Sequence, residues 1–399
     1  MSATTEPRSV APSEPLPAEP QSPLARLSPE QIEQLGREFD AIHDEVYADL
    51  GDRDARYIRS TIALHRRLVL AARATLLLSR RRPAWLAGTA MLSLAKILEN
   101  MELGHNILHG QWDWMNDPDI NSQAWDWDTA SPSDAWKHSH NYEHHTFTNI
   151  RGKDRDLGYE IMRIDPHQKW HPVYILQPLY NLLLMGFFEW GVAVHDLNTE
   201  AIRSGEKPKA QVLEELKAIG EKARRQIVKD YIAFPALSAA VDGAVAGPGA
   251  ARRTFKTTFW ADFWANIVRN VWSHSIIFCG HFPDQTYTFS QDEVADESRG
   301  GWYVRQLLGA ANIDGGPLFH LLSGNLSFQV EHHLYPDMPS SRYAEIAPRV
   351  RDICRRYELP YNTGPLRKQL GTVHRTILRL AFPGGRVREK PGPYRPASA

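Results

Sequence analysis

The 399-residue sequence predicts an all-α protein, a bundle of about four membrane-spanning helices with a cytosolic helical cap. The first observation is a set of four apolar stretches, each interrupted by a few charged residues, at 61–79, 84–110, 232–250 and 260–282. Charges in such segments face a bundle interior or a site. The second observation is that Trp85, Trp190, Trp260 and Trp264 lie near ends of apolar runs, as an interfacial belt requires.

The N-terminus is predicted to be a disordered tail over residues 1–27, because it is rich in proline and poor in large apolar residues. It has no apolar core of the kind that secretory signals carry. Ser28 and Pro29 then fit the N-cap and first position of a helix, with Gln31 completing a capping box. Apolar residues at three- and four-residue spacing predict an amphipathic helix over 28–50.

A single domain is predicted over residues 28–380. Its membrane helices are expected within 61–282 and its cytosolic part within 283–380, followed by a flexible tail at 381–399. The charge-free run at 170–188 has the best hydropathy for a span. The second and third histidine groups, described below, have to meet on one side of the membrane. An even number of crossings must therefore separate them. We therefore expect 170–188 to be re-entrant, interfacial or packed in the cap.

Composition excludes several classes of protein. Lysine and arginine number 46 against 47 acidic residues, so binding to nucleic acid through net positive charge is not expected. The two cysteines, Cys279 and Cys354, are too few for a disulfide scaffold, a CxxC zinc site or a cysteine-ligated iron–sulfur cluster.

Histidines form three groups: HxxxH at 105–109, HxxxHH at 140–145 and QxxHH at 329–333. Residues four apart project from one face of a helix, so each histidine pair can point at one place. With 17 histidines in 399 residues, HxxxHH would occur about 0.03 times by chance. Seven imidazoles exceed the four ligands of a tetrahedral zinc, and two metal ions fit better. Imidazole alone does not select iron, but attack on an unactivated C–H bond with O₂ requires a redox metal.

The segments HNYEHHTFTNIRGKDRDLGY at 140–159 and SGNLSFQVEHHLYPDMPSSRY at 323–343 resemble integral-membrane fatty-acid desaturases. The similarity is greatest to the bacterial, actinobacterial acyl-CoA branch with a QxxHH third box, and FEWGVAVHDL at 188–197 and FCGHFPD at 278–284 share it. It extends over about residues 28–380. It implies an O₂-dependent fatty-acyl desaturase that takes electrons from a separate reductase, ferredoxin or cytochrome-type donor. An acyl-CoA is the favoured substrate. The protein would be integral to the membrane, the inner membrane in a bacterium, with its active site facing the cytoplasm.

The resemblance implies two iron ions and this set of ligands: His105, His109, His140, His144, His145, His281, Gln329, His332 and His333. Gln329 replaces a histidine, which leaves one metal with a weaker amide ligand or with water. The ligand from the last membrane helix could be His274 or His281, and we favour His281 because it lies at the polar end. Glu189, Asp154 and Asp156 are candidates for orienting ligands, with solvated or structural roles equally open. His195, Asp196 and His320 are candidates for supporting ligands or lining the substrate channel, or for ordinary structural roles.

Two alternatives stay open at this point. A hydroxylase or ketolase on the same di-iron scaffold would add oxygen rather than remove hydrogen. A non-catalytic membrane metal-binding protein would hold metal without consuming O₂, and broken histidine boxes would be its clearest sign.

Overall fold

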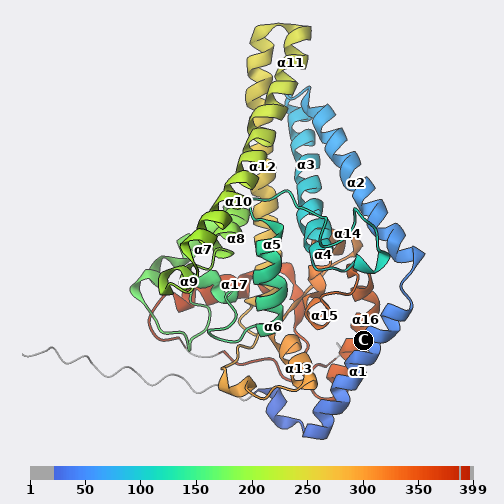
Figure 1. The fold of residues 1–399 in the computed structure, drawn as a ribbon, viewed down its shortest axis with the longest axis vertical. Coiled ribbons are helices and arrows are strands. Elements are labelled where there is room, and N and C mark those ends of the chain that lie inside the picture. Colours follow the sequence, from blue (N-terminus) through green and yellow to red (C-terminus); the bar gives the residue numbers. More distant parts are fainter. Residues whose placement is uncertain (1–21, 386–387, 396–399) are drawn as a thin grey trace, which may run out of the picture.

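The computed structural model describes residues 22–385 and 388–395, and nearly all of its regular structure is helical. Four helices form an arm that projects from a wider base, which we call the helical arm (Figure 1). It consists of α2 (Asp52–Leu76), α3 (Arg82–Leu98), α11 (Phe234–Ala246) and α12 (Pro248–His281). Helix α2 packs on α3, α11 packs on α12, and α3 joins the two pairs through α12. These helices correspond to the four apolar stretches of the sequence.

The predicted membrane topology is overturned by the helices themselves. Across residues 22–385 and 388–395, no helix combines the length and apolar character that crossing a membrane requires. Helices α3 and α11 have 17 and 13 residues, whereas a span needs about 20. The longer α2 and α12 carry several charged residues along their length. The prediction of about four spanning helices is therefore wrong, and so is the integral-membrane location with a cytoplasm-facing site that depended on it.

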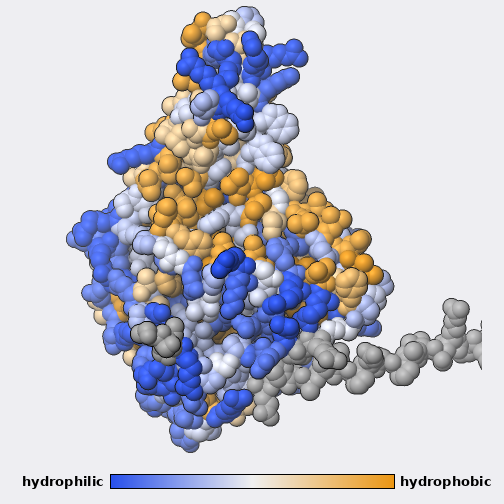
Figure 2. All heavy atoms as spheres, turned by 180° about the vertical axis from the view of Figure 1, so that it is seen from behind, coloured by the Kyte–Doolittle hydropathy of each residue, from blue (hydrophilic) through white to orange (hydrophobic). Residues whose placement is uncertain are grey.

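Charged residues within or just beside the apolar stretches form ion pairs inside the arm and with the segments that adjoin its helices. The N···O distances are 2.6–2.8 Å for the pairs Arg80–Asp242, Arg73–Asp262 and Lys96–Asp230. Apolar side chains gather around the middle of the arm, whereas polar ones are prominent near its far end and cover much of the base (Figure 2). The exposed apolar residues include Leu237 and Val241 on α11 and Trp260 and Trp264 on α12.

The base contains a hydrophobic core built around α1 (Pro29–Ala48), α13 (Arg299–Gly309) and α16 (Tyr343–Arg356). Helix α1 begins with the expected capping box between Ser28 and Gln31. A two-stranded parallel sheet pairs β1 (Asn312–Asp314) with β2 (Thr363–Pro365). The other helices of the C-terminal half are α14 (Pro317–Leu322), η9 (Leu326–Phe328), α15 (Gln329–Leu334), η10 (Ser340–Arg342) and α17 (Leu366–Leu380).

The charge-free run at 170–188 divides into short helices. It forms η6 (Pro172–Leu176) and α7 (Gln177–Gly186) and enters α8 (Phe188–His195), and α7 packs on α12 and α17. Beyond it, α10 (Lys209–Ile227) continues through the π-helical η7 (Val228–Ala233) into α11. The remaining short helices are η3 (Asp113–Met115), η5 (Leu157–Glu160), α9 (Thr199–Ser204) and η8 (Asp292–Val294).

Of the predicted terminal tails, residues 1–21, 386–387 and 396–399 lie outside the described residues. Within the predicted N-terminal tail, η1 (Pro23–Arg26) is a short 3-10 helix, and Leu24 and Leu27 pack against the core of the base. Within the C-terminal tail, the ring of Tyr394 contacts that of Tyr361.

Candidate metal centre

The first two histidine groups lie on π-helical turns. Helix α3 passes directly into η2 (Glu99–His105), which is followed by α4 (Asn106–Leu108) and His109. Helix α5 (Ser133–Trp136) passes into η4 (Lys137–His144), followed by α6 (His145–Phe147). Such turns insert one residue into a helix and occur frequently at functional sites. Here they rotate the histidines toward the interior of the base.

The other ligand candidates come from α15 and from the last residue of α12. Helix α15 supplies Gln329, His332 and His333, and α12 ends at His281. The turn that leads toward α15 contains Gly324, whose φ is +66° and whose added Cβ would lie 2.3 Å from the Met101 carbonyl oxygen. Only glycine permits this close contact, which joins the chain before the third histidine group to the π-turn of the first histidine group.

All nine predicted ligands come together in the base, and each is buried. In one cluster, His105, His109, His140 and His332 have potential ligand atoms within 4.8 Å of one another. In a second, His144, His281 and His333 meet the same limit, and His145 is grouped with His332 and His333 between the two. The Nε2 of His281 lies 3.2 Å from that of His333 and 3.0 Å from Nε2 of Gln329. Two adjacent metal positions are therefore available.

Four acceptors outside the clusters fix the tautomers of ring nitrogens. The Nδ1–H groups of His144 and His140 donate to Asp154 at 3.1 Å and to Asp156 at 3.4 Å. The hydroxyl of Tyr343 donates to the Tyr335 carbonyl oxygen, and so it accepts from Nδ1 of His332 at 3.2 Å. Nδ1 of His333 donates to Oε1 of Gln306 at 2.9 Å. Each bond leaves the Nε2 lone pair of its ring for a metal.

The donor set fits metal ions in protonation state and in hydrogen bonding. Burial, followed by the neighbouring rings, lowers the pKa of His105, His109, His145 and His281 well below the usual value, and these rings are neutral. Burial also opposes protonation of His144, but Asp154 and Asp156 raise its pKa. Among the described residues, buried ring nitrogens without a hydrogen-bond partner occur on five of the predicted ligands, His109, His140, His144, His145 and His281, and also on His195 and His274 outside the clusters. Buried polar atoms are normally paired, and metal ions would satisfy those on the five clustered histidines.

The two histidines of α12 have different surroundings. His281 belongs to the second cluster. His274 lies within hydrogen-bond distance of Asn181, with 2.9 Å from its Nε2 to the amide oxygen, and its ring stacks on Phe278. Burial lowers the pKa of His274 to about 3, so it is a neutral histidine of the core.

Several residues at the site were not singled out by sequence reasoning. Gln306 lies on α13, 27 residues before His333, and Tyr343 begins α16, 11 residues after His332. Trp136 stacks on His140 with 4.6 Å between ring centroids and contacts His105 and His109 edge-on. The tryptophan-rich stretch before the second group was the available signal for Trp136, whereas no local pattern marks the other two.

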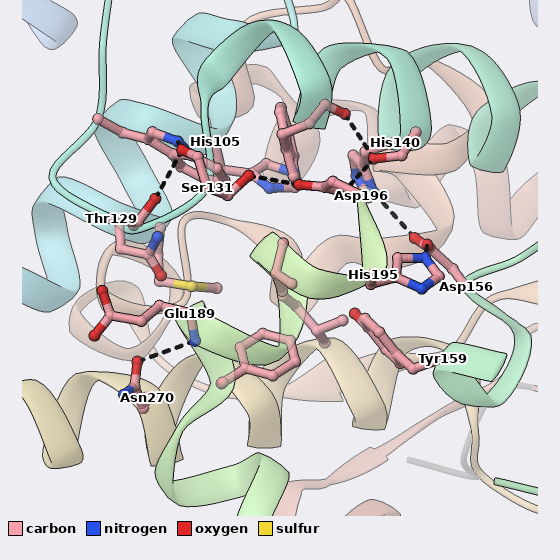
Figure 3. Close-up of a pocket in the computed structure, with 18 residues that line it drawn as sticks. His105, Thr129, Ser131, His140, Asp156, Tyr159, Glu189, His195, Asp196 and Asn270 are labelled. Carbon is pink, nitrogen blue, oxygen red and sulfur yellow. Dashed lines mark hydrogen bonds and ion pairs between the residues drawn. The ribbon is translucent and has the colours of Figure 1, made fainter. Parts of the chain in front are cut away.

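A pocket reaches the first cluster from the side of α8 and α12 (Figure 3). His105 and His140 form part of its wall. Its apolar lining comes from Met101, Trp127, Trp136, Tyr159, Phe188, Val192 and Ile277. Asp156 also lines the pocket, where it accepts from His195 at 2.8 Å and connects that residue to His140. An apolar chain in this pocket would lie directly against the first metal position.

Comparisons with known proteins agree with this geometry. The family model for fatty acid desaturases matches residues 83–365. An NADPH-dependent stearoyl-CoA 9-desaturase of Mycobacterium tuberculosis is 46% identical over 366 residues, 92% of this chain and 84% of the relative. An sn-1 linoleoyl-lipid 6-desaturase of Synechocystis is 25% identical over 71% of this chain and 76% of its own. No solved structure matches significantly. The chain belongs to the fatty acid desaturase family and is an acyl desaturase of its bacterial branch.

Proposed function

We propose that the two clusters hold two iron ions, bound by His105, His109, His140, His144, His145, His281, Gln329, His332 and His333. The observation that carries this proposal is the convergence of buried imidazoles on two adjacent positions beside an apolar pocket. Imidazole ligands suit iron, and the redox chemistry of desaturation excludes zinc as the working metal. Gln329 would provide a weaker amide ligand.

The substrate in this proposal is a saturated long-chain acyl-CoA, with stearoyl-CoA as the leading candidate and the ninth carbon as the site of the double bond. The name of the mycobacterial relative supports this choice. The pocket supports it chemically, because tryptophan, phenylalanine and aliphatic side chains favour a hydrocarbon over water.

The reaction removes two hydrogens from adjacent carbons, and O₂ accepts them with two electrons and two protons to give two waters. Bound iron would supply the activation of O₂. Trp136 and Phe188 would exclude water from the acyl chain at the first cluster. Asp154, Asp156, Gln306 and Tyr343 would hold the ligating rings in orientation through the Nδ1 hydrogen bonds described above. A separate NADPH-dependent donor protein would supply the electrons, in keeping with the name of the relative.

The test combines metal analysis with product analysis. Purified active protein should contain close to two irons per chain, and with stearoyl-CoA, O₂ and an electron donor it should form a product two hydrogens lighter. Mass spectrometry after cleavage of the double bond gives its position. Active protein with one zinc and no iron would contradict the metal proposal. A product that gains oxygen would point to the hydroxylase chemistry instead.

A further inference from the structure

Two tryptophans continue the ring contacts of the first cluster away from the metal position. Trp136 stacks on His140 with 4.6 Å between ring centroids. Its indole also contacts His105 and His109 edge-on, at 5.2 and 5.5 Å. Trp127 contacts Trp136 in turn, with 4.9 Å between centroids, and each of the two residues is 6% exposed. We call Trp136 and Trp127 the indole pair.

The outer member of the indole pair belongs to the walls of two cavities. Trp127 lines the acyl pocket, and it also lines a groove between α2, α3, the end of α10 and η7. Arg225 lines the same groove with a side chain that is 65% exposed, so the groove opens to solvent. The indole N–H of Trp127 donates to the Ser131 carbonyl oxygen at 2.8 Å, which fixes the ring in this wall. The indole pair therefore connects the ligand rings to a solvent-filled groove.

The other tryptophans of the stretch 112–136 are placed differently. Trp112 is fully buried, stacks on Tyr57 at 6.0 Å and belongs to a separate hydrophobic cluster. Within the described residues, neither it nor Trp114 nor Trp125 makes a ring contact with a predicted ligand. Contact with the metal centre is thus a property of the indole pair and not of the tryptophan-rich stretch as a whole.

The electron balance of the proposed reaction gives the indole pair a chemical role. Reduction of O₂ to two waters takes four electrons and four protons. The external donor supplies two electrons, and the acyl chain supplies two more with its two hydrogens. When O₂ is activated without an acyl chain, those last two electrons and two protons are missing. The oxidisable ring that contacts three of the ligands, Trp136, is then the nearest source of an electron.

We propose that the indole pair carries oxidising equivalents from the metal centre to the groove when no acyl chain is bound, and so protects the ligand rings from oxidation. The inference rests on the proposed two-iron centre. Trp136 gives one electron to the oxidised centre, Trp127 gives one to Trp136, and a thiol in the groove gives one electron to Trp127 and releases one proton. Two such transfers convert two thiols into one disulfide and complete the reduction of O₂ to two waters. The protein thereby has a second activity, thiol oxidation in the absence of acyl substrate.

The experiment follows iron-loaded full-length protein that consumes O₂ with its electron donor and no acyl substrate. Electron paramagnetic resonance of freeze-quenched samples should show an indole radical, and peptide mass spectrometry should find added oxygen on Trp127 and Trp136. Addition of glutathione should remove the added oxygen and form up to one glutathione disulfide per O₂ consumed. Stearoyl-CoA should suppress both the radical and the disulfide, because the acyl chain then supplies the electrons.

Two substitutions at one position separate redox chemistry from packing. Trp127→Phe removes the oxidisable ring, whereas Trp127→Tyr replaces it by an oxidisable ring of nearly the same size as phenylalanine. Trp127→Phe should abolish thiol oxidation, move the added oxygen to Trp136 and His140, and shorten the lifetime of the protein during substrate-free turnover several-fold. Trp127→Tyr should restore thiol oxidation and most of that lifetime. Trp112→Phe is the matched control and should behave like the wild type, because Trp112 is a buried tryptophan outside the indole pair.

Three results would overturn the inference. The first is wild-type protein that consumes O₂ without an indole radical or an oxidised tryptophan. The second is equal thiol oxidation by Trp127→Phe and Trp127→Tyr, and the third is a loss of thiol oxidation in Trp112→Phe as large as that in Trp127→Phe. Protein that binds no iron and consumes no O₂ would instead refute the proposed function. Protein that forms the radical but leaves stearoyl-CoA unchanged would keep the indole pair's role and refute the proposed substrate.

Discussion

Alanine substitutions at the two histidines of α12 should separate metal binding from fold stability. His281→Ala removes an imidazole from the second cluster, so we expect about one iron per chain and no turnover. The metal-free protein should lose only the roughly 1–2 kcal/mol that the cavity costs, because the Nε2 of His281 faces the cluster nitrogens of Gln329 and His333 and its Nδ1 is without a hydrogen-bond partner among the described residues.

His274→Ala should have the reverse effect, and its magnitude follows from two lost contacts and the cavity left behind. The variant loses the 2.9 Å hydrogen bond to Asn181 and leaves a buried amide oxygen unpaired, at a cost of about 1–3 kcal/mol. It also loses the stack on Phe278, whose ring centroid is 3.7 Å away, and leaves a cavity that costs roughly 1–2 kcal/mol more. Because the ring is neutral, no buried charge is lost. The free energy of unfolding should therefore fall by about 3 kcal/mol while the iron content stays near two.

The assay pairs iron analysis of each purified variant with denaturant unfolding of its chelator-treated form. His274→Gln is a useful control, because its amide can still donate to Asn181 and should restore part of the lost stability. If His281→Ala keeps wild-type activity and iron while His274→Ala loses both, the ligand assignment on α12 is refuted and His274 takes the place of His281.

Three further substitutions test other parts of the site and the arm. Asp154→Asn removes the charged acceptor of His144 Nδ1 and should reduce metal affinity 10–100-fold, as measured by competition with a chelator. Gln329→Ala should keep partial turnover, with water in place of the amide. Complete loss of activity in this variant would show that the amide is an essential ligand. Gln329→His tests whether the site accepts a full imidazole set. Asp230→Asn removes the 2.8 Å partner of Lys96 and leaves it Asp128 at 3.5 Å. Denaturant unfolding should show a loss of up to about 3–5 kcal/mol, and a change below about 1 kcal/mol would contradict the role given to this pair.

The sequence contained enough information to predict which histidines cluster but too little to predict the residues that support them. Histidines at four-residue spacing lie on one helical face whether that face belongs to an α-helix or to the π-turns found here, so His140 and His144 could be paired in advance. Gln306 and Tyr343 contact the cluster only because α13 and α16 fold over it. Contacts of that kind depend on tertiary packing and leave no periodic signal in the chain.

The membrane prediction was wrong because apolar stretches were interpreted as continuous helices. The stretch at 84–110 is divided among α3, η2 and α4. The stretch at 232–250 begins in the π-turn η7 and ends at Gly247, where φ is +84°. Hydropathy over a sequence window does not detect such divisions, because a change of winding alters the path of the chain without altering its composition.

The same polar residues that interrupt the apolar stretch of α3 fix the first histidine group. Lys96 is anchored to Asp230 at 2.8 Å, and Glu99 accepts from the backbone N–H of Asp128 at 2.8 Å. Glu102, one turn before His105, accepts hydrogen bonds from three side chains that lie far apart in sequence, those of Tyr57, Asn325 and Ser340. Each of these hydrogen bonds is buried or partly buried. A buried carboxylate that lost its donors would be destabilised by desolvation. The three partners, which lie on separate elements, therefore hold the π-turn in one position. Residues that break the regular sequence pattern of a helix are most frequent at functional sites. Here the polar interruptions of α3 and η2 are the contacts that hold His105 in place.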